Sequence, residues 1–140
     1  MDLFKATIKD DPAAQQLTRD WIDALRSGRY TQGTGSLRSG IGKSKDYCCL
    51  GVLCDLVGPD QWNTYNGWRS ATDNGLDDPV YSDLPDSLRK RMHMSRMSGG
   101  FTDDSEHEAS SSLVILNDGT DVGFAGIADQ IERELNLALA

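Results

Sequence analysis

Apolar residues concentrate in one run near the middle of the chain. Residues 47–57 read YCCLGVLCDLV and contain a single charged side chain, Asp55. A helix of this composition is apolar nearly all round, and such helices are buried. We therefore predict a central core helix over 47–57, which the following Gly58-Pro59 ends.

Helical spacing also predicts a first helix from about residue 12 to 27. Asp10 or Asp11 can cap it, Pro12 suits its first turn, and Gly28 can end it in a left-handed conformation. Its apolar stripe consists of Leu17, Trp21, Ile22, Ala24 and Leu25.

The second half of the chain predicts two more helices. One starts at Asp83-Leu84-Pro85 and runs to about Met97, where Gly99-Gly100 ends it. Residues 112–116 fit either a strand or a helical turn, and the following Asn-Asp-Gly predicts a turn. The last helix has apolar residues at helical spacing, namely Phe124, Ile127, Ala128, Ile131 and Leu135.

The remaining segments are rich in turn residues. Residues 28–46 contain five glycines and predict a loop or a glycine-rich hairpin, and residues 61–81 predict short strands or a hairpin with a turn at Asn66-Gly67. Residues 101–112 are polar and acidic and predict a mobile loop. The whole predicts a single α+β domain over 1–140, with about four helices around the buried central helix and a short antiparallel sheet or hairpins.

Charge is distributed unevenly along the chain. The net charge of −8 argues against direct binding of DNA or RNA, which requires a basic surface. Residues 29–45 and 87–100 nevertheless contain four Lys or Arg each and no acid. These two basic islands could meet as one anion site, or they could be two separate solvated faces.

The N-terminus and the cysteines indicate an intracellular protein. No run of 18 apolar residues is present, and the first residues lack the features of a signal peptide, so we expect a cytoplasmic protein with no membrane partner. Three cysteines, two of them adjacent, are typical of reduced, buried thiols and do not have the spacing of a zinc site. We expect no metal and no cofactor.

Gly42-Lys43-Ser44 resembles the end of a phosphate-binding loop. The full pattern requires a glycine where this chain has Leu37, so the segment does not predict a P-loop NTPase. A glycine-rich turn that presents backbone N–H groups and Lys43 at the N-terminus of the central helix still predicts an anion cradle, with a flexible loop that binds no ligand as the alternative.

The predicted ligand-binding residues follow from these patterns. Cations of the first island would bind phosphates, and Trp68 of an aromatic cluster would stack a base unless it only fills the core. The predicted set is Arg29, Arg38, Lys43, Ser44, Lys45, Trp68 and Arg69. No nucleophile with a base is visible, so we do not expect an enzyme.

Three motifs resemble an uncharacterised family of small proteins found in phage and prophage genomes. The first is W-x-x-A-L-R-S-G-x-Y-x-Q-G from Trp21, the second is the Y-C-C-L-G-V-L-C-D run from Tyr47, and the third is L-N-D-G from Leu116, followed by the last helix. The family form has Ser-Phe before that helix, and here Gly123-Phe124 stands there, so the usual serine cap is missing.

The resemblance implies a phage accessory protein that acts in the cytoplasm of a bacterial host. We expect it to sequester a small phosphate-bearing molecule, such as a nucleotide immune signal, as a counter-defence factor. The alternative is an acidic protein-interaction module that inhibits a host defence protein or imitates the charge of DNA. The oligomeric state stays open, and a homo-oligomer is compatible with either reading.

Overall fold

The computed structural model describes residues 3–72, 75–76, 78–96 and 113–140, and it has the predicted α+β architecture. The helical elements of the described residues are η1 (Ala6–Asp10), α1 (Pro12–Arg26), α2 (Cys49–Val57), α3 (Asp86–Arg91), α4 (Leu113–Gly119) and α5 (Phe124–Leu139). The strands are β1 (Thr31–Gln32), β2 (Arg38–Ile41), β3 (Ser44–Tyr47), β4 (Ala71–Thr72) and β5 (Gly75–Leu76).

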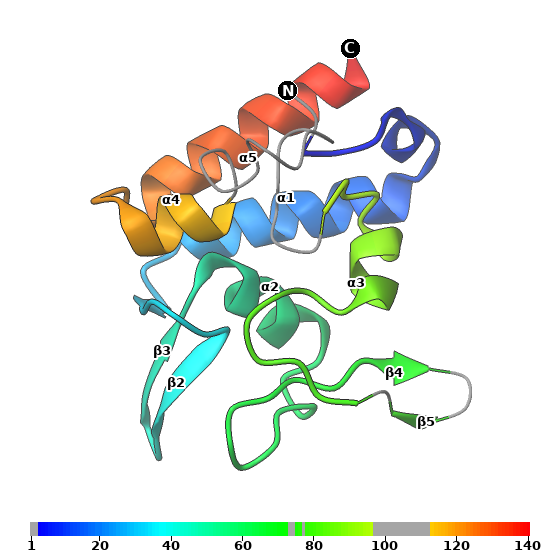
Figure 1. Cartoon of the computed structure of the whole chain (residues 1–140). Coiled ribbons are helices and arrows are strands. Elements are labelled where there is room, and N and C mark those ends of the chain that lie inside the picture. The colour runs from blue at the N-terminus through cyan, green and yellow to red at the C-terminus, as the bar shows by residue number, and fades with distance from the viewer. Residues whose placement is uncertain (1–2, 73–74, 77, 97–112) are drawn as a thin grey trace.

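The two long helices, α1 and α5, pack against each other on one side of the molecule (Figure 1). The shorter α2 packs against α1 and α4, and the β2–β3 hairpin extends away from the helices (Figure 1). All three side chains of Trp21, Leu50 and Ile131 are fully buried, so helices from three parts of the chain share one core.

The structure confirms the predicted first and last helices, α1 and α5. Asp11 accepts a 3.0 Å hydrogen bond from the N–H of Ala14, Pro12 is the first helical residue, and Gly28 has a φ of +79°. The last helix lacks a side-chain cap at Gly123, as its sequence predicts.

The central helix is buried as predicted, but it begins at Cys49 and not at residue 47. Tyr47 pairs with Arg38 as the last residue of β3, and Cys48 is extended. Its thiol accepts a hydrogen bond from the N–H of Gly51, so a cysteine takes the place of the usual N-cap residue.

The third helix is much shorter than predicted. Pro85 is its extended N-cap and not its first helical residue, and the helix ends at Arg91. The physical reason is tertiary: His93 has a φ of +56°, and its carbonyl accepts a hydrogen bond from the N–H of Lys5. This pairing draws the segment after α3 away from helical geometry, and the predicted stop at 99–100 lies outside the described residues.

Three further predictions are resolved as follows. Residues 113–119 form α4, so the described part of the ambiguous segment, 113–116, is helical, and the predicted Asn-Asp-Gly turn belongs to the end of that helix. The sheet around β3 is mixed, because β1 pairs with β3 in parallel while β2 pairs with it antiparallel. The predicted acidic loop at 101–112 lies outside the described residues.

Residues 61–81 contain short strands, as predicted, but the hairpin of β4 and β5 follows residue 70 and does not turn at Asn66-Gly67. Asn66-Gly67 lies instead between Trp62 and Trp68, which a single bridge joins. Another isolated bridge joins Trp68 to Val80. This segment therefore folds back on itself beside the C-terminal end of α2.

Candidate functional site

The β2–β3 hairpin places two lysines at its far end. Ile41 pairs with Ser44, so Gly42 and Lys43 form the two-residue turn between the strands. Gly42 has a φ of +61°, which suits the turns that fit twisted hairpins. Lys43 therefore lies at the tip of the hairpin, and Lys45 follows on β3. The prediction that Lys43 lies at the N-terminus of the central helix is wrong, because β3 separates this turn from α2.

The hairpin forms one wall of an open cleft of about 540 Å3. The cleft brings together three of the predicted cations, Arg29, Lys43 and Lys45. Its other lining residues are Tyr30, Thr31, Gly42, Tyr47 and Asp55. Within the described residues no ion pair involves these three cations, so their charges are available to an anion.

Asp55 is the one acid of the cleft, and two donors satisfy it. The hydroxyl of Tyr30 donates to Oδ2 at 2.7 Å, and the indole Nε1–H of Trp62 donates to Oδ1 at 3.0 Å. With three cations and one acid, the lining has a formal charge of +2 in a chain whose net charge is −8.

The two tyrosines of the cleft are neutral donors at physiological pH. Burial, followed by the hydrogen bond to Asp55, raises the pKa of Tyr30. Burial and the charge of Asp55 also raise the pKa of Tyr47, against the opposing effect of Arg38. The rings pack edge to face with their centroids 5.0 Å apart, which fixes the aromatic wall of the cleft.

Arg38 lies behind this wall and is 9 % exposed. Its Nε–H donates to Oδ1 of Asn66 at 2.7 Å, and its guanidinium lies 4.4 Å from the ring centroid of Trp62. These contacts hold the hairpin against the 62–66 segment, so Arg38 supports the cleft without lining it.

The other predicted ligand-binding residues lie elsewhere. Ser44 is exposed on β3 but does not line the cleft. Trp68 is 1 % exposed and donates its indole N–H to the carbonyl of Gly58 at 2.9 Å. The backbone N–H of Arg69 donates to Gln61, again outside the cleft.

The two basic islands do not converge on this cleft, since none of its lining residues comes from the second island. Arg89 of the second island pairs with Asp86 and donates to the carbonyl of Met94. Arg91 lines a different cavity.

Sequence reasoning missed Tyr30, Tyr47 and Asp55. The Tyr30–Asp55 hydrogen bond joins residues 25 positions apart, a distance over which local patterns carry no information. The available signal was Asp55 itself, the one charged residue of an otherwise apolar helix, because such a residue must find polar partners.

The cysteines are free and buried, as predicted. Burial raises the pKa of Cys48 to about 11 and raises the pKa values of Cys49 and Cys54 as well. Over the ranges that the structure describes, no group of three or more His, Cys, Asp or Glu residues is arranged to hold a metal ion. No helix in those ranges is both long and apolar enough to cross a membrane.

Comparison with known proteins places this chain in a family. Residues 13–135 match the family described as Domain of unknown function (DUF8296). The chain belongs to this family. No curated protein and no solved structure matches the chain.

In this DUF8296 protein, the three motifs that begin at Trp21, Tyr47 and Leu116 are hydrogen-bonded to one another. The indole of Trp21 donates to the carbonyl of Cys49 at 2.9 Å, which joins the first motif to the second. The side chain of Gln32 donates to Oδ1 of Asn117 at 3.0 Å, which joins the first motif to the third. Residues of the three motifs therefore join α1 to α2 and β1 to α4.

Proposed function

We propose that this DUF8296 protein is a phage-encoded accessory protein that binds a phosphate-bearing small molecule in the cleft between Arg29 and the β2–β3 hairpin. The observation that supports this most is the convergence of Arg29, Lys43 and Lys45 on one cleft, without an ion pair to any described residue. Guanidinium and ammonium groups bind phosphate oxygens through charge-assisted hydrogen bonds.

The remaining walls favour a nucleotide over inorganic phosphate. The neutral hydroxyl groups and rings of Tyr30 and Tyr47 offer contacts for a sugar and a base. The carboxylate of Asp55 has acceptor capacity beyond its two present hydrogen bonds, which suits a ribose hydroxyl or a base N–H. A protein that sequesters a nucleotide signal in the bacterial cytoplasm would act as a counter-defence factor.

The test is a thermal melt at low salt against mono-, di- and cyclic nucleotides. A ligand at 100 times its dissociation constant adds about 2.7 kcal/mol, which corresponds to a rise in Tm of roughly 8–10 °C for a domain of this size. The Lys43→Ala, Lys45→Ala double variant should abolish this rise while its own Tm without ligand stays unchanged, since neither side chain has a hydrogen bond or ion pair to a described residue.

The matched control is the Lys5→Ala, Arg19→Ala double variant, which removes two exposed cations far from the cleft lining. This control should bind as the wild type does. If the Lys43→Ala, Lys45→Ala variant bound the nucleotide as tightly as the wild type, the ligand would lie outside this cleft. If no nucleotide raised the Tm of the wild type, the proposal would be contradicted.

One observation favours the alternative, a module that binds a host protein. Two large side chains at the hairpin end are strongly exposed: Ile41 is 86 % and Tyr65 is 82 % exposed. The side chain of Asn66 donates to the carbonyl of Gly40 at 3.0 Å, which joins the two segments that carry them. Two results together would favour this alternative. No nucleotide would raise the Tm, and a host protein would bind the wild type but not the Ile41→Ser, Tyr65→Ser variant.

A further inference from the structure

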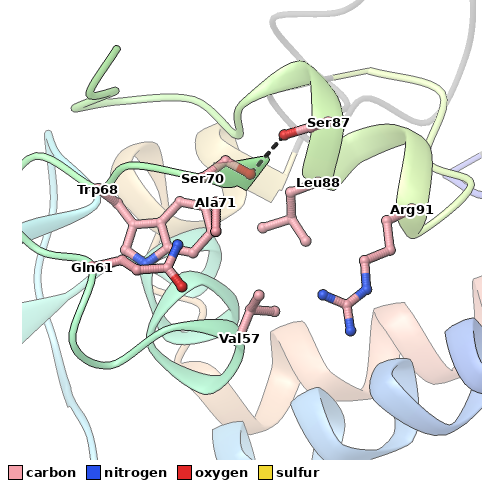
Figure 2. Close-up of a pocket in the computed structure, with 8 residues that line it drawn as sticks. All are labelled: Val57, Gln61, Trp68, Ser70, Ala71, Ser87, Leu88 and Arg91. Carbon is pink, nitrogen blue, oxygen red and sulfur yellow. Dashed lines mark hydrogen bonds between the residues drawn. The ribbon is translucent and has the colours of Figure 1, made fainter. Parts of the chain in front are cut away.

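A second cavity lies between the C-terminal end of α2, the 61–71 segment and α3 (Figure 2). Its volume is about 330 Å3, equivalent to roughly ten water molecules. It shares no lining residue with the cation-lined cleft, so it is a separate site.

Four of the eight residues that line this cavity are apolar: Val57, Trp68, Ala71 and Leu88. Figure 2 shows Trp68 on one side, Val57 below and Leu88 above. The indole of Trp68 is fixed, because its N–H donates to the carbonyl of Gly58 at 2.9 Å and 1 % of the residue is exposed. Leu88 is also covered, at 2 % exposure, so the apolar surface that a ligand can contact comes mainly from Val57 and Ala71.

Arg91 extends from the last residue of α3 towards the space between Val57 and Leu88 (Figure 2). The two preceding cations of the helix, Arg89 and Lys90, both pair with Asp86. Arg91, by contrast, has no ion pair or hydrogen bond to a described residue. Its guanidinium is therefore a cation at the edge of a cavity with a mixed polar and apolar lining, and its donors are available to a ligand.

A pair of hydroxyl groups adds a second donor. Ser87 and Ser70 are hydrogen-bonded to each other at 2.7 Å, and Ser70 is 7 % exposed. Two hydroxyl groups carry two protons, and the bond between them uses one. One hydroxyl proton of the pair is left for a third group, such as an acceptor in the cavity.

We propose that this cavity binds a small carboxylate with a branched aliphatic or aromatic body. The body lies against Val57 and Ala71, and the carboxylate meets the planar fork of Arg91, whose geometry matches two carboxylate oxygens. A single cation pairs with a single negative charge, which distinguishes this site from the three-cation cleft proposed for phosphates.

The test is NMR titration of the 15N-labelled protein with 4-methylpentanoate. The chain has three tryptophans, so it gives three indole N–H signals, and Trp68→Phe assigns the one that matters. The Trp68 signal should move saturably at millimolar ligand. The uncharged 4-methylpentanamide should bind at least tenfold more weakly, because it lacks the charge that Arg91 recognises.

Two variants of α3 distinguish an effect of the Arg91 guanidinium from an effect of the overall positive charge of the helix. Arg91→Gln should weaken binding of 4-methylpentanoate about tenfold or more without a change in Tm, whereas Lys90→Gln, one residue away, should leave it unchanged. The Lys43→Ala, Lys45→Ala variant should also bind normally, which keeps this result independent of the proposed function. Three outcomes would each overturn the proposal: no saturable movement of the Trp68 signal, equal binding of acid and amide, or undiminished binding by Arg91→Gln.

Discussion

Oδ1 of Asn117 accepts a 3.2 Å hydrogen bond from the backbone N–H of Cys49, the first residue of α2. The same oxygen accepts from Gln32, and Nδ2 of Asn117 donates to the carbonyl of Gly33 at 2.7 Å. Asn117 is 2 % exposed, so one buried amide connects α4, the start of the central helix and the strand next to the hairpin. The position of the cleft depends on this connection, since Tyr30 and Thr31 directly precede Gln32.

Replacing Asn117 should therefore destabilise the whole domain. Asn117→Ala leaves the buried N–H of Cys49 and the part-buried carbonyl of Gly33 without this partner, and we expect a loss of about 3 kcal/mol in the free energy of unfolding. Urea denaturation measures it. Asp121→Asn is the control, because Asp121 is exposed in the following turn, and it should change stability by less than about 0.5 kcal/mol. Equal stability of the two variants would contradict the role of Asn117.

Gly51 is required by close packing inside the apolar run. A Cβ at this position would lie 1.8 Å from the carbonyl oxygen of Leu37, so α2 and the backbone before β2 can approach only with a glycine here. Gly51→Ala should cost about 3 kcal/mol or more, because a backbone segment has to shift.

Gly126→Ala is the matched control for Gly51→Ala, since both glycines lie within helices. At Gly126 the added methyl group meets only a side-chain methyl of Val122, which can rotate away. Alanine is the better helix former, so this variant should gain up to about 1 kcal/mol. Both changes can be measured by urea denaturation, and a stable Gly51→Ala protein would show that α2 does not pack as described.

The elements that could be predicted from the sequence are those with local signals. The caps at Asp11 and Gly28 and the repeats of α1 and α5 are properties of neighbouring residues, and these helices were predicted correctly. The third helix was predicted too long because its end is set by a contact between Lys5 and His93, far apart in the chain.

The candidate site divides in the same way. Composition alone indicated Arg29, Lys43 and Lys45, since basic residues without nearby acids are visible in the sequence. It could not show that Arg38 is covered by Trp62, because that depends on how the 62–66 segment folds back on the hairpin.

The three thiols should be unreactive in the folded protein. With a pKa of about 11, Cys48 is ionised to about one part in a thousand at pH 8, and burial protects Cys49 and Cys54 as well. Mass spectrometry after iodoacetamide treatment should show no label on the native protein and three labels in urea. Rapid modification of one native thiol would contradict the burial of α2.

The contact between Asp11 and His93 predicts a stability difference that depends on pH. Oδ2 of Asp11 lies 2.8 Å from Nε2 of His93, and this hydrogen bond, with that from Ala14, lowers the pKa of Asp11. A carboxylate whose pKa is lowered on folding stabilises the protein above its unfolded pKa, about 3.9, and loses this contribution as the pH falls through the folded value.

Asp11→Asn tests this directly, because asparagine still caps α1 but has no charge. The variant should be less stable than the wild type at about pH 5.5, and the difference should shrink towards zero as the pH falls through the lowered pKa of the folded state. Urea denaturation across this range measures it. Asp10→Asn is the control, since Asp10 is exposed and its side chain has no hydrogen bond or ion pair to a described residue. A difference for Asp11→Asn that stays constant down to the lowest pH would mean that the asparagine acts through lost packing or capping, and that the charge of Asp11 does not stabilise the contact with His93.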